Sequence, residues 1–201
     1  MKKLILVRGP LGVGKTTVAR KLAASLNAHY ISIDSVLEEN HLDQAEEDGI
    51  PVKNFIKGNE LVLPEIRSAL EKGKPVIIDG CFYHKEQIEH FIQNLDAPCF
   101  VFTLKAPLEV CIERDKGREK SYGEGAAWAV HGMVSKFDYG TGVITEDKTP
   151  EETMEEIESN LGRKFSTIFW DSDGTLVDTE PPYFKVTQTV LKEVGIDLTR
   201  E

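Results

Sequence analysis

The sequence contains no long hydrophobic run. Its longest uncharged apolar stretches cover only a few residues, such as 4–7 and 76–78, whereas a membrane-spanning helix needs about 20. The apolar stretch after the basic start ends at Arg8, so it does not indicate a secretory signal peptide. We therefore expect a soluble, cytoplasmic protein that makes no use of a membrane.

The sequence also has few cysteines and fewer basic than acidic residues, and both facts exclude or disfavour certain classes of protein. Cys81, Cys99 and Cys111 are the only cysteines and form no CxxC pair, so neither a disulfide framework nor a zinc site is indicated. Basic residues number 24 against 34 acidic ones, and the net charge of −10 disfavours a long nucleic-acid footprint without excluding a local basic groove. The 201 residues, 40% of them hydrophobic, suffice for one large or two small domains with a packed core.

Short apolar runs alternate with amphipathic stretches, a pattern typical of βαβ units and a parallel sheet. Two stretches interrupt it: 44–58 is predicted to be a loop over a substrate site, and 115–125 a basic, flexible segment. Trp128 and Phe137, at helical distance from Met133, are expected in the core. The predicted strands are 3–7, 30–33, 76–78 and 99–104, and the predicted helices include 59–71, 84–94, 108–114 and 150–161.

A glycine-rich segment between the first strand and an amphipathic helix fits the pattern G-x-x-x-x-G-K-[ST]. Glycines let the backbone wrap closely around an anion, and the N-terminus of the following helix adds a positive dipole. Lys15 would supply a charge for the outer phosphates, and the Thr16 hydroxyl would ligate Mg²⁺. We expect a nucleoside triphosphate to be bound here by Gly9, Gly12, Val13, Gly14, Lys15, Thr16 and Thr17.

An aspartate follows each of two predicted strands: Asp34 after 30–33, and Asp79 after 76–78. The carboxyl ends of parallel strands meet at one edge of a sheet, so both should lie beside the glycine-rich loop. One carboxylate there can accept the proton of an attacking hydroxyl, and the other can orient Mg²⁺. Either could instead cap the helix that follows it. We assign the base to Asp34 and the metal to Thr16 and Asp79, although the residue pattern alone leaves the two aspartates interchangeable.

The basic segment contains Arg114 and Arg118, which would share one face if the preceding helix continued. A guanidinium that arrives late can stabilise the charge of a transferring phosphate. Gly117 and later glycines would let the segment close over ATP as a lid. The alternative is a solvated run of charges in which Asp115 and Glu119 pair locally.

These motifs, together with Thr145-x-x-x-Thr149-Pro-Glu-Glu, resemble the small P-loop kinases: shikimate, gluconate and nucleoside-monophosphate kinases and the kinase half of phage polynucleotide kinase. The resemblance covers about residues 2–161. It implies an α/β P-loop kinase fold whose five parallel strands lie in the order 2-3-1-4-5, with the fifth at 142–145. It further implies ATP and Mg²⁺ as cofactors, Asp34 facing the acceptor hydroxyl, Arg118 as the catalytic lid arginine, and Arg114 near the adenine and phosphates.

One departure concerns the acceptor. Shikimate and nucleotide kinases place arginines on the carboxylate or phosphate of the substrate, whereas the substrate side of this sequence offers only Lys53, Lys57 and Arg67. We expect an ATP-dependent kinase that phosphorylates a hydroxyl of a small metabolite or nucleoside. Two alternatives stay open: a polynucleotide 5′-hydroxyl kinase, which the charge of about −8 over residues 1–162 opposes, and a regulatory module that hydrolyses ATP slowly.

The last residues, 163–201, resemble the opening of a different family. Asp171-Ser-Asp173-Gly-Thr-Leu after an apolar run is similar to the first motif of haloacid-dehalogenase-type phosphatases, in which the first aspartate is the nucleophile and the second a general acid or base. A phosphoaspartate mechanism also needs groups that hold the phosphate and complete the metal site. We therefore expect a kinase domain at 1–162 and an incomplete appendage without phosphatase activity at 163–201.

Overall fold

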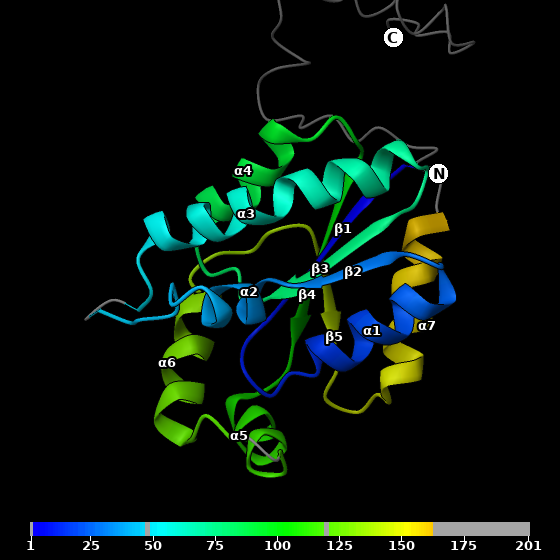
Figure 1. Cartoon of the computed structure of the whole chain (residues 1–201). Helices are drawn as coiled ribbons and strands as arrows, with labels where there is room; N and C mark the ends of the chain where they lie inside the picture. The colour runs from blue at the N-terminus through cyan, green and yellow to red at the C-terminus, as the bar shows by residue number, and fades with distance from the viewer. Residues whose placement is uncertain (1, 47–48, 119–120, 163–201) are drawn as a thin grey trace, which may run out of the picture. The chain divides into compact units, whose positions relative to one another are not determined.

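The structure, a computed structural model, describes residues 2–46, 49–118 and 121–162. Five parallel strands form one sheet in the order β2-β3-β1-β4-β5 (Figure 1). This order confirms the prediction. The central strand β1 pairs with β3 on one side and β4 on the other. The strands are β1 (Leu4–Arg8), β2 (His29–Ser32), β3 (Val76–Gly80), β4 (Cys99–Lys105) and β5 (Thr141–Ile144).

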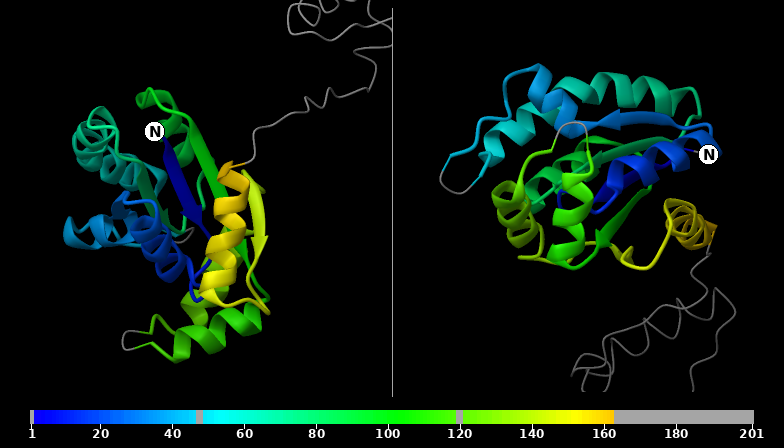
Figure 2. Two further views of the ribbon diagram at one scale, coloured as in Figure 1. Left: turned by 90° about the vertical axis from the view of Figure 1, so that its right-hand side faces the viewer. Right: turned by 90° about the horizontal axis from the view of Figure 1, so that it is seen from below.

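The sheet is buried on both faces, as parallel sheets usually are. Helices α3 (Val52–Glu71) and α4 (Lys85–Asn94) cover one face, and α1 (Lys15–Ser25) and α7 (Pro150–Gly162) cover the other (Figures 1 and 2). Because side chains alternate along a strand, Leu4 and Leu6 of β1 pack with α3 and α4. Ile5 and Val7 pack with α1 and α7. The strand that leads into the glycine-rich loop is therefore fixed from both sides.

A third apolar cluster lies at the carboxyl edge of the sheet. It joins Leu11 of the glycine-rich loop to Leu37 of α2 (Ile33–Glu39), Phe55 of α3, and Ala127 and Val134 of α6 (Glu124–Val134). Helix α5 (Leu108–Lys116) packs against α6 at the same end of the molecule (Figure 1). The elements that follow the strands thus build the walls of a site around the loop.

Three expectations about local structure are wrong. The segment 44–58 is not a loop throughout, because α3 begins at Val52. The segment 115–125 is partly helical, since α5 runs to Lys116 and α6 begins at Glu124. Trp128 is 67% exposed and not part of the core, because α6 buries Ala127 and Val134 instead. Because much of α6 is glycine and alanine, its large hydrophobic residues do not repeat with a clear helical period, and the sequence does not indicate which face is buried.

Within the part of the chain that the structure describes, no helix is both long and apolar enough to cross a membrane. Residues 163–201, with the predicted phosphatase-like motif at Asp171 and Asp173, lie outside the described residues. The two-domain division at 162/163 therefore stays a prediction.

Candidate active site

The glycine-rich loop, residues 9–14, connects β1 to α1 and lies against α5. Gly12 and Gly14 have φ values of +77° and +97°, in the left-handed region that favours glycine. A Cβ on Gly12 would lie 1.9 Å from the carbonyl oxygen of Cys111, so no side chain fits there. The backbone of the loop is thereby shaped around the start of α1, where N–H groups and the helix dipole favour an anion.

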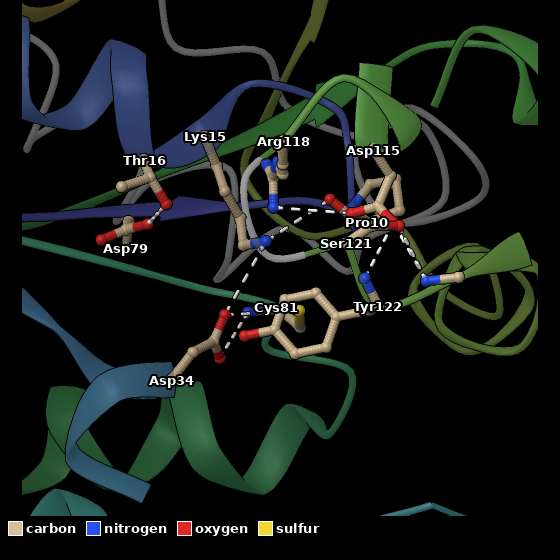
Figure 3. A network of polar contacts seen from close by, with 11 residues as sticks. Pro10, Lys15, Thr16, Asp34, Asp79, Cys81, Asp115, Arg118, Ser121 and Tyr122 are labelled. Atoms are coloured by element: carbon tan, nitrogen blue, oxygen red, sulfur yellow. Dashed lines mark hydrogen bonds and ion pairs between the residues drawn. The ribbon is translucent and has the colours of Figure 1, made fainter. Parts of the chain in front are cut away.

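Lys15, the first residue of α1, is 3% exposed. Its Nζ lies 3.4 Å from the carbonyl oxygen of Pro10 and 3.7 Å from Oδ2 of Asp34 (Figure 3). Burial by itself would lower the pKa of this ammonium, but the acidic groups around it outweigh burial and raise the pKa above its ordinary value. Lys15 therefore carries its charge at neutral pH, inside the loop where phosphates would lie.

Asp79 is fully buried near the end of β3 and accepts hydrogen bonds from two hydroxyl groups. Its Oδ2 accepts a hydrogen bond from Oγ1 of Thr16, and its Oδ1 accepts one from the hydroxyl of Tyr30, both 2.6 Å long. Mg²⁺ is usually bound by one or two protein oxygens together with substrate phosphates. The Thr16 hydroxyl and the Asp79 carboxylate, in contact beside the phosphate loop, are a donor set that fits this ion.

The buried charge of Asp79 leads to a prediction about stability. Burial raises the pKa of this carboxyl, against the opposing effect of the hydrogen bonds from Thr16 and Tyr30. A raised pKa in the folded state means that folding favours the protonated form, so the contribution of Asp79 to stability falls as pH rises from about 4 through the raised pKa. Without nucleotide or metal, we expect Asp79→Asn to gain stability relative to the wild type across that pH range.

Urea unfolding at a series of pH values measures this gap in the free energy of unfolding. The matched control is Asp96→Asn, which removes one carboxylate from an exposed loop. A wild-type advantage that grows with pH would show that the hydrogen bonds to Asp79 outweigh its burial.

Asp34 lies in the first turn of α2, directly after β2. The alternative role as helix cap belongs to Ser32 instead, whose hydroxyl accepts from the backbone N–H of Ser35 at 3.5 Å. Asp34 accepts from the backbone N–H of Cys81 at 3.2 Å, and its side chain is one third exposed. Burial and the neighbouring Asp34 raise the pKa of the Cys81 thiol to about 12, so this thiol stays neutral.

The two aspartates therefore have different surroundings. The carboxylate of Asp79 is enclosed and engaged by Thr16 and Tyr30, whereas the carboxylate of Asp34 faces a cavity. Gly80, which follows Asp79, lets the start of α2 lie close to the end of β3. A Cβ at this position would lie 2.2 Å from Cγ2 of Ile33, the residue before Asp34. Tyr30 could not be predicted as a partner of Asp79, because tyrosine in a strand is ordinary core composition.

Arg118 follows α5 and extends toward Lys15 (Figure 3), close enough for its charge to lower the pKa of Lys15. Its guanidinium lies 3.7 Å from Oδ1 of Asp115. The other oxygen of Asp115 accepts from the hydroxyl of Ser121 and from the backbone N–H of Tyr122 and Gly123, at 2.8 to 3.2 Å. Asp115 therefore pairs locally, as in the alternative of a solvated run of charges, but it is buried and not solvated, and Glu119 lies outside the described residues.

Arg114 contacts protein groups in this structure. Its guanidinium donates to Oγ1 and the carbonyl oxygen of Thr145 and to the carbonyl oxygen of Glu146, at 2.8 to 3.2 Å. Thr145 in turn donates to the carbonyl oxygen of Val13 at 3.3 Å. Arg114 therefore connects α5 through the segment after β5 to the phosphate loop, and its predicted contact with nucleotide stays a prediction.

Arg8, the last residue of β1, is fully buried. Its guanidinium donates to the carbonyl oxygens of Val134 and Phe137 at 2.9 and 3.2 Å and to the Thr103 hydroxyl at 3.3 Å. It also lies 4.3 Å from the ring centroid of Phe137. Burial lowers its pKa to about 10, so the charge persists at neutral pH. The position of a basic residue at the end of a central strand does not by itself predict that its guanidinium is buried and hydrogen-bonded to the C-terminal end of α6.

A cavity of about 810 Å³ opens beside Asp34. Its wall comes from Leu11 of the glycine-rich loop, from α2 and α3 and the described residues between them, from the segment after β3, from Tyr122, and from α6 and Lys136 after it. The predicted substrate-side residues do not line it: Lys53 lies 3.9 Å from Glu46, and Arg67 donates to the carbonyl oxygen of Asn94. The lining residues include Asp34, Leu37, Glu38, Asp43, Glu46, Phe55, Tyr83, Tyr122, Trp128, Met133 and Lys136.

Known proteins are similar to this chain in sequence or in fold. The UMP-CMP kinase 2 of Caenorhabditis elegans is 24% identical over 170 residues, which cover 79% of this chain and 89% of that protein. An adenylate kinase of Nautilia profundicola is 33% identical over 160 residues, or 73% and 79% of the two chains. The crystal structure of a sugar kinase from Janibacter sp. HTCC2649 superimposes with a TM-score of 0.64, at 18% identity, over 80% of this chain and 95% of that one.

Residues 4–137 also match the model of a family described as an AAA domain. The matched part contains the phosphate loop, both aspartates and Arg118. Because this match spans most of the chain and the relatives are kinases, the chain belongs to the AAA domain family, as a kinase with the P-loop kinase fold.

Proposed function

We propose that this protein is an ATP-dependent phosphotransferase that moves the γ-phosphate of ATP to a hydroxyl group of a small metabolite or nucleoside. The position of Asp34 carries the proposal. One oxygen of its carboxylate lies 3.7 Å from Nζ of Lys15, on the nucleotide side, while the same side chain lines the 810 Å³ cavity. An acceptor in that cavity would meet the γ-phosphate at Asp34. Residues 1–162 would form this kinase domain.

The residues around the loop would have separate roles in binding the nucleotide and its metal ion. The backbone of the loop would bind the phosphates, and Lys15 and Arg118 would stabilise the negative charge that spreads over the γ-phosphate during transfer. Thr16 and Asp79 would hold Mg²⁺, which, when bound, neutralises phosphate charge. These groups lie together around the loop, and positioning of this kind lowers the barrier to transfer.

On the acceptor side, Asp34 would orient the hydroxyl group and accept its proton. The acceptor oxygen then forms a bond to the γ-phosphorus, the bond between that phosphorus and the β,γ-bridging oxygen breaks, and ADP leaves. The N–H of Cys81 holds one oxygen of Asp34, which keeps the carboxylate in place.

Arg118 offers a test of the nucleotide side. We expect Arg118→Ala to lower the transfer rate by about 10²-fold or more while ATP affinity changes little, because the guanidinium acts mainly on charge that develops in the transition state. Steady-state kinetics and calorimetric titration with ATP measure the two effects. Lys116→Ala is the matched control, because Lys116 is exposed and lies 3.9 Å from Glu124. A parallel collapse of ATP affinity would make Arg118 a static binding residue.

The function itself is tested by following labelled γ-phosphate. Sugars, nucleosides, shikimate-like acids and 5′-hydroxyl oligonucleotides are offered as acceptors, and label is measured in each product and in free phosphate. Transfer to a small hydroxyl compound supports the proposal. Transfer to oligonucleotides alone would favour the polynucleotide kinase alternative, and release of phosphate without any transfer would favour an ATPase module.

A further inference from the structure

The hydroxyl group of Tyr30 contacts the candidate metal site, although the proposed chemistry gives it no role. It donates to Oδ1 of Asp79 at 2.6 Å. The other oxygen, Oδ2, accepts from Oγ1 of Thr16 at 2.6 Å (Figure 3). Asp79 is fully buried, and Tyr30 and Thr16 are partly buried. The carboxylate therefore has a hydroxyl donor on each oxygen, one from the neighbouring strand β2 and one from α1.

These two hydrogen bonds fix the rotation of the Asp79 carboxylate. The last torsion of an aspartate side chain is broad and roughly two-fold, so it defines the plane of the carboxylate only weakly by itself. With Oδ1 bound by Tyr30, Oδ2 is the oxygen that faces Thr16 at the start of α1. Because the Thr16 hydroxyl gives its proton to Oδ2, its lone pairs stay available for a cation.

The ring of Tyr30 is itself confined by α1. The guanidinium of Arg20 lies 5.4 Å from the ring centroid, within the range of a cation–π contact. Arg20 comes four residues after Thr16, so both lie on one face of the helix. The ring also packs against the apolar cluster that joins β1 and β3 to α1 and α7. The helix that carries Thr16 therefore also restrains the tyrosine that orients Asp79.

We infer that Tyr30 is a positioning residue for Mg²⁺, whose hydroxyl orients Asp79 so that Oδ2 and the Thr16 hydroxyl stay together as the oxygens offered to the ion. This inference rests on the metal role of Thr16 and Asp79 in the proposed function. Loss of a group that orients a metal-binding side chain typically lowers metal affinity by about 10- to 100-fold. A hydroxyl that only satisfied a buried carboxylate would instead affect stability and leave Mg²⁺ binding unchanged.

The test measures nucleotide binding to the full chain without turnover. A non-hydrolysable β,γ-imido analogue of ATP is titrated by calorimetry once with Mg²⁺ and once with a chelator, and the ratio of the two dissociation constants reports the effect of the metal. We expect Tyr30→Phe to lower this ratio by about tenfold or more and to leave metal-free binding nearly unchanged. Thr16→Ala, which removes a proposed ligand, should lower the ratio at least as far.

Two further variants control for the change in the fold. Tyr139→Phe removes the hydroxyl of another partly buried tyrosine, which packs against the apolar cluster on the other face of the sheet, and should keep the wild-type ratio. Arg20→Ala changes an exposed residue and frees the Tyr30 ring without touching Asp79. It should lower the ratio by about two- to fivefold, and it tests the inference even where Tyr30→Phe unfolds.

The outcomes separate the inference from the function on which it rests. A wild-type ratio in Tyr30→Phe, or an equal loss of affinity with and without Mg²⁺, overturns the positioning role and leaves the proposed function standing, provided that Thr16→Ala lowers the ratio. If Thr16→Ala also keeps the wild-type ratio, the metal assignment itself is wrong and the inference falls with it.

Discussion

Replacing Lys15 by alanine should lower turnover by a factor on the order of 10² or more, with the fold retained. The ammonium is held inside the phosphate loop, 3.4 Å from the Pro10 carbonyl oxygen, and its charge persists at neutral pH because the acidic groups around it raise its pKa. In a loose phosphoryl-transfer transition state, charge moves onto oxygens that this group would contact. The measurement is steady-state transfer at saturating ATP, with thermal unfolding to confirm the fold.

Lys21→Ala serves as the matched control. Lys21 belongs to the same helix but is exposed, and it contacts Glu151 of α7 at the surface. We expect its kinetics to equal those of the wild type. Unchanged turnover in Lys15→Ala would show that the assignment of Lys15 to the reacting phosphates is wrong.

Asp34→Asn should separate chemistry from nucleotide binding. Asparagine keeps the size of the side chain and its contact with the Cys81 N–H but cannot accept the acceptor proton. Transfer should therefore fall by about 10² to 10⁴-fold, while ATP affinity changes far less. Rate measurements with the acceptor identified by labelling, together with calorimetry of ATP binding, give the two quantities.

Asp96→Asn, in an exposed loop, controls for loss of one surface charge. Equal losses of transfer and ATP affinity in Asp34→Asn would place this residue on the nucleotide side. The base would then be Asp79, which is enclosed by Thr16 and Tyr30 and would have to release them first.

The site was predictable where one local pattern encodes it. The residues of the glycine-rich loop have a fixed spacing, and the motif requires only a strand before it and a helix after it. Gly12, Gly14 and Lys15 therefore lie where the motif predicts them. Asp34 and Asp79 followed from the rule that parallel strands end at one edge of a sheet. Strand order came from resemblance, since hydrophobic periodicity predicts elements but not their neighbours.

The remainder depends on contacts that the sequence does not encode locally. Asp115 accepts three hydrogen bonds from residues six to eight positions later, and Tyr30 finds Asp79 across a strand pair. Helix α6 was missed because glycine and alanine leave its apolar stripe without a clear period. Trp128 was assigned to the core because it is hydrophobic and at helical distance from Met133, whereas it lines the cavity beside Asp34.

The buried Arg8 ties this helix to the strand that carries the phosphate loop. Its bonds to the carbonyl oxygens of Val134 and Phe137 fix the C-terminal end of α6, while the N-terminal end is joined to α5 through the hydrogen bonds of Tyr122 and Gly123 to Asp115 and through the pair between Glu124 and Lys116. Breaking the Arg8 bonds would leave a buried cation without partners, which is costly. Helix α6 is therefore tied at one end to the strand that leads into the phosphate loop and at the other to Asp115, the partner of Arg118, so a displacement of this helix would be felt by both.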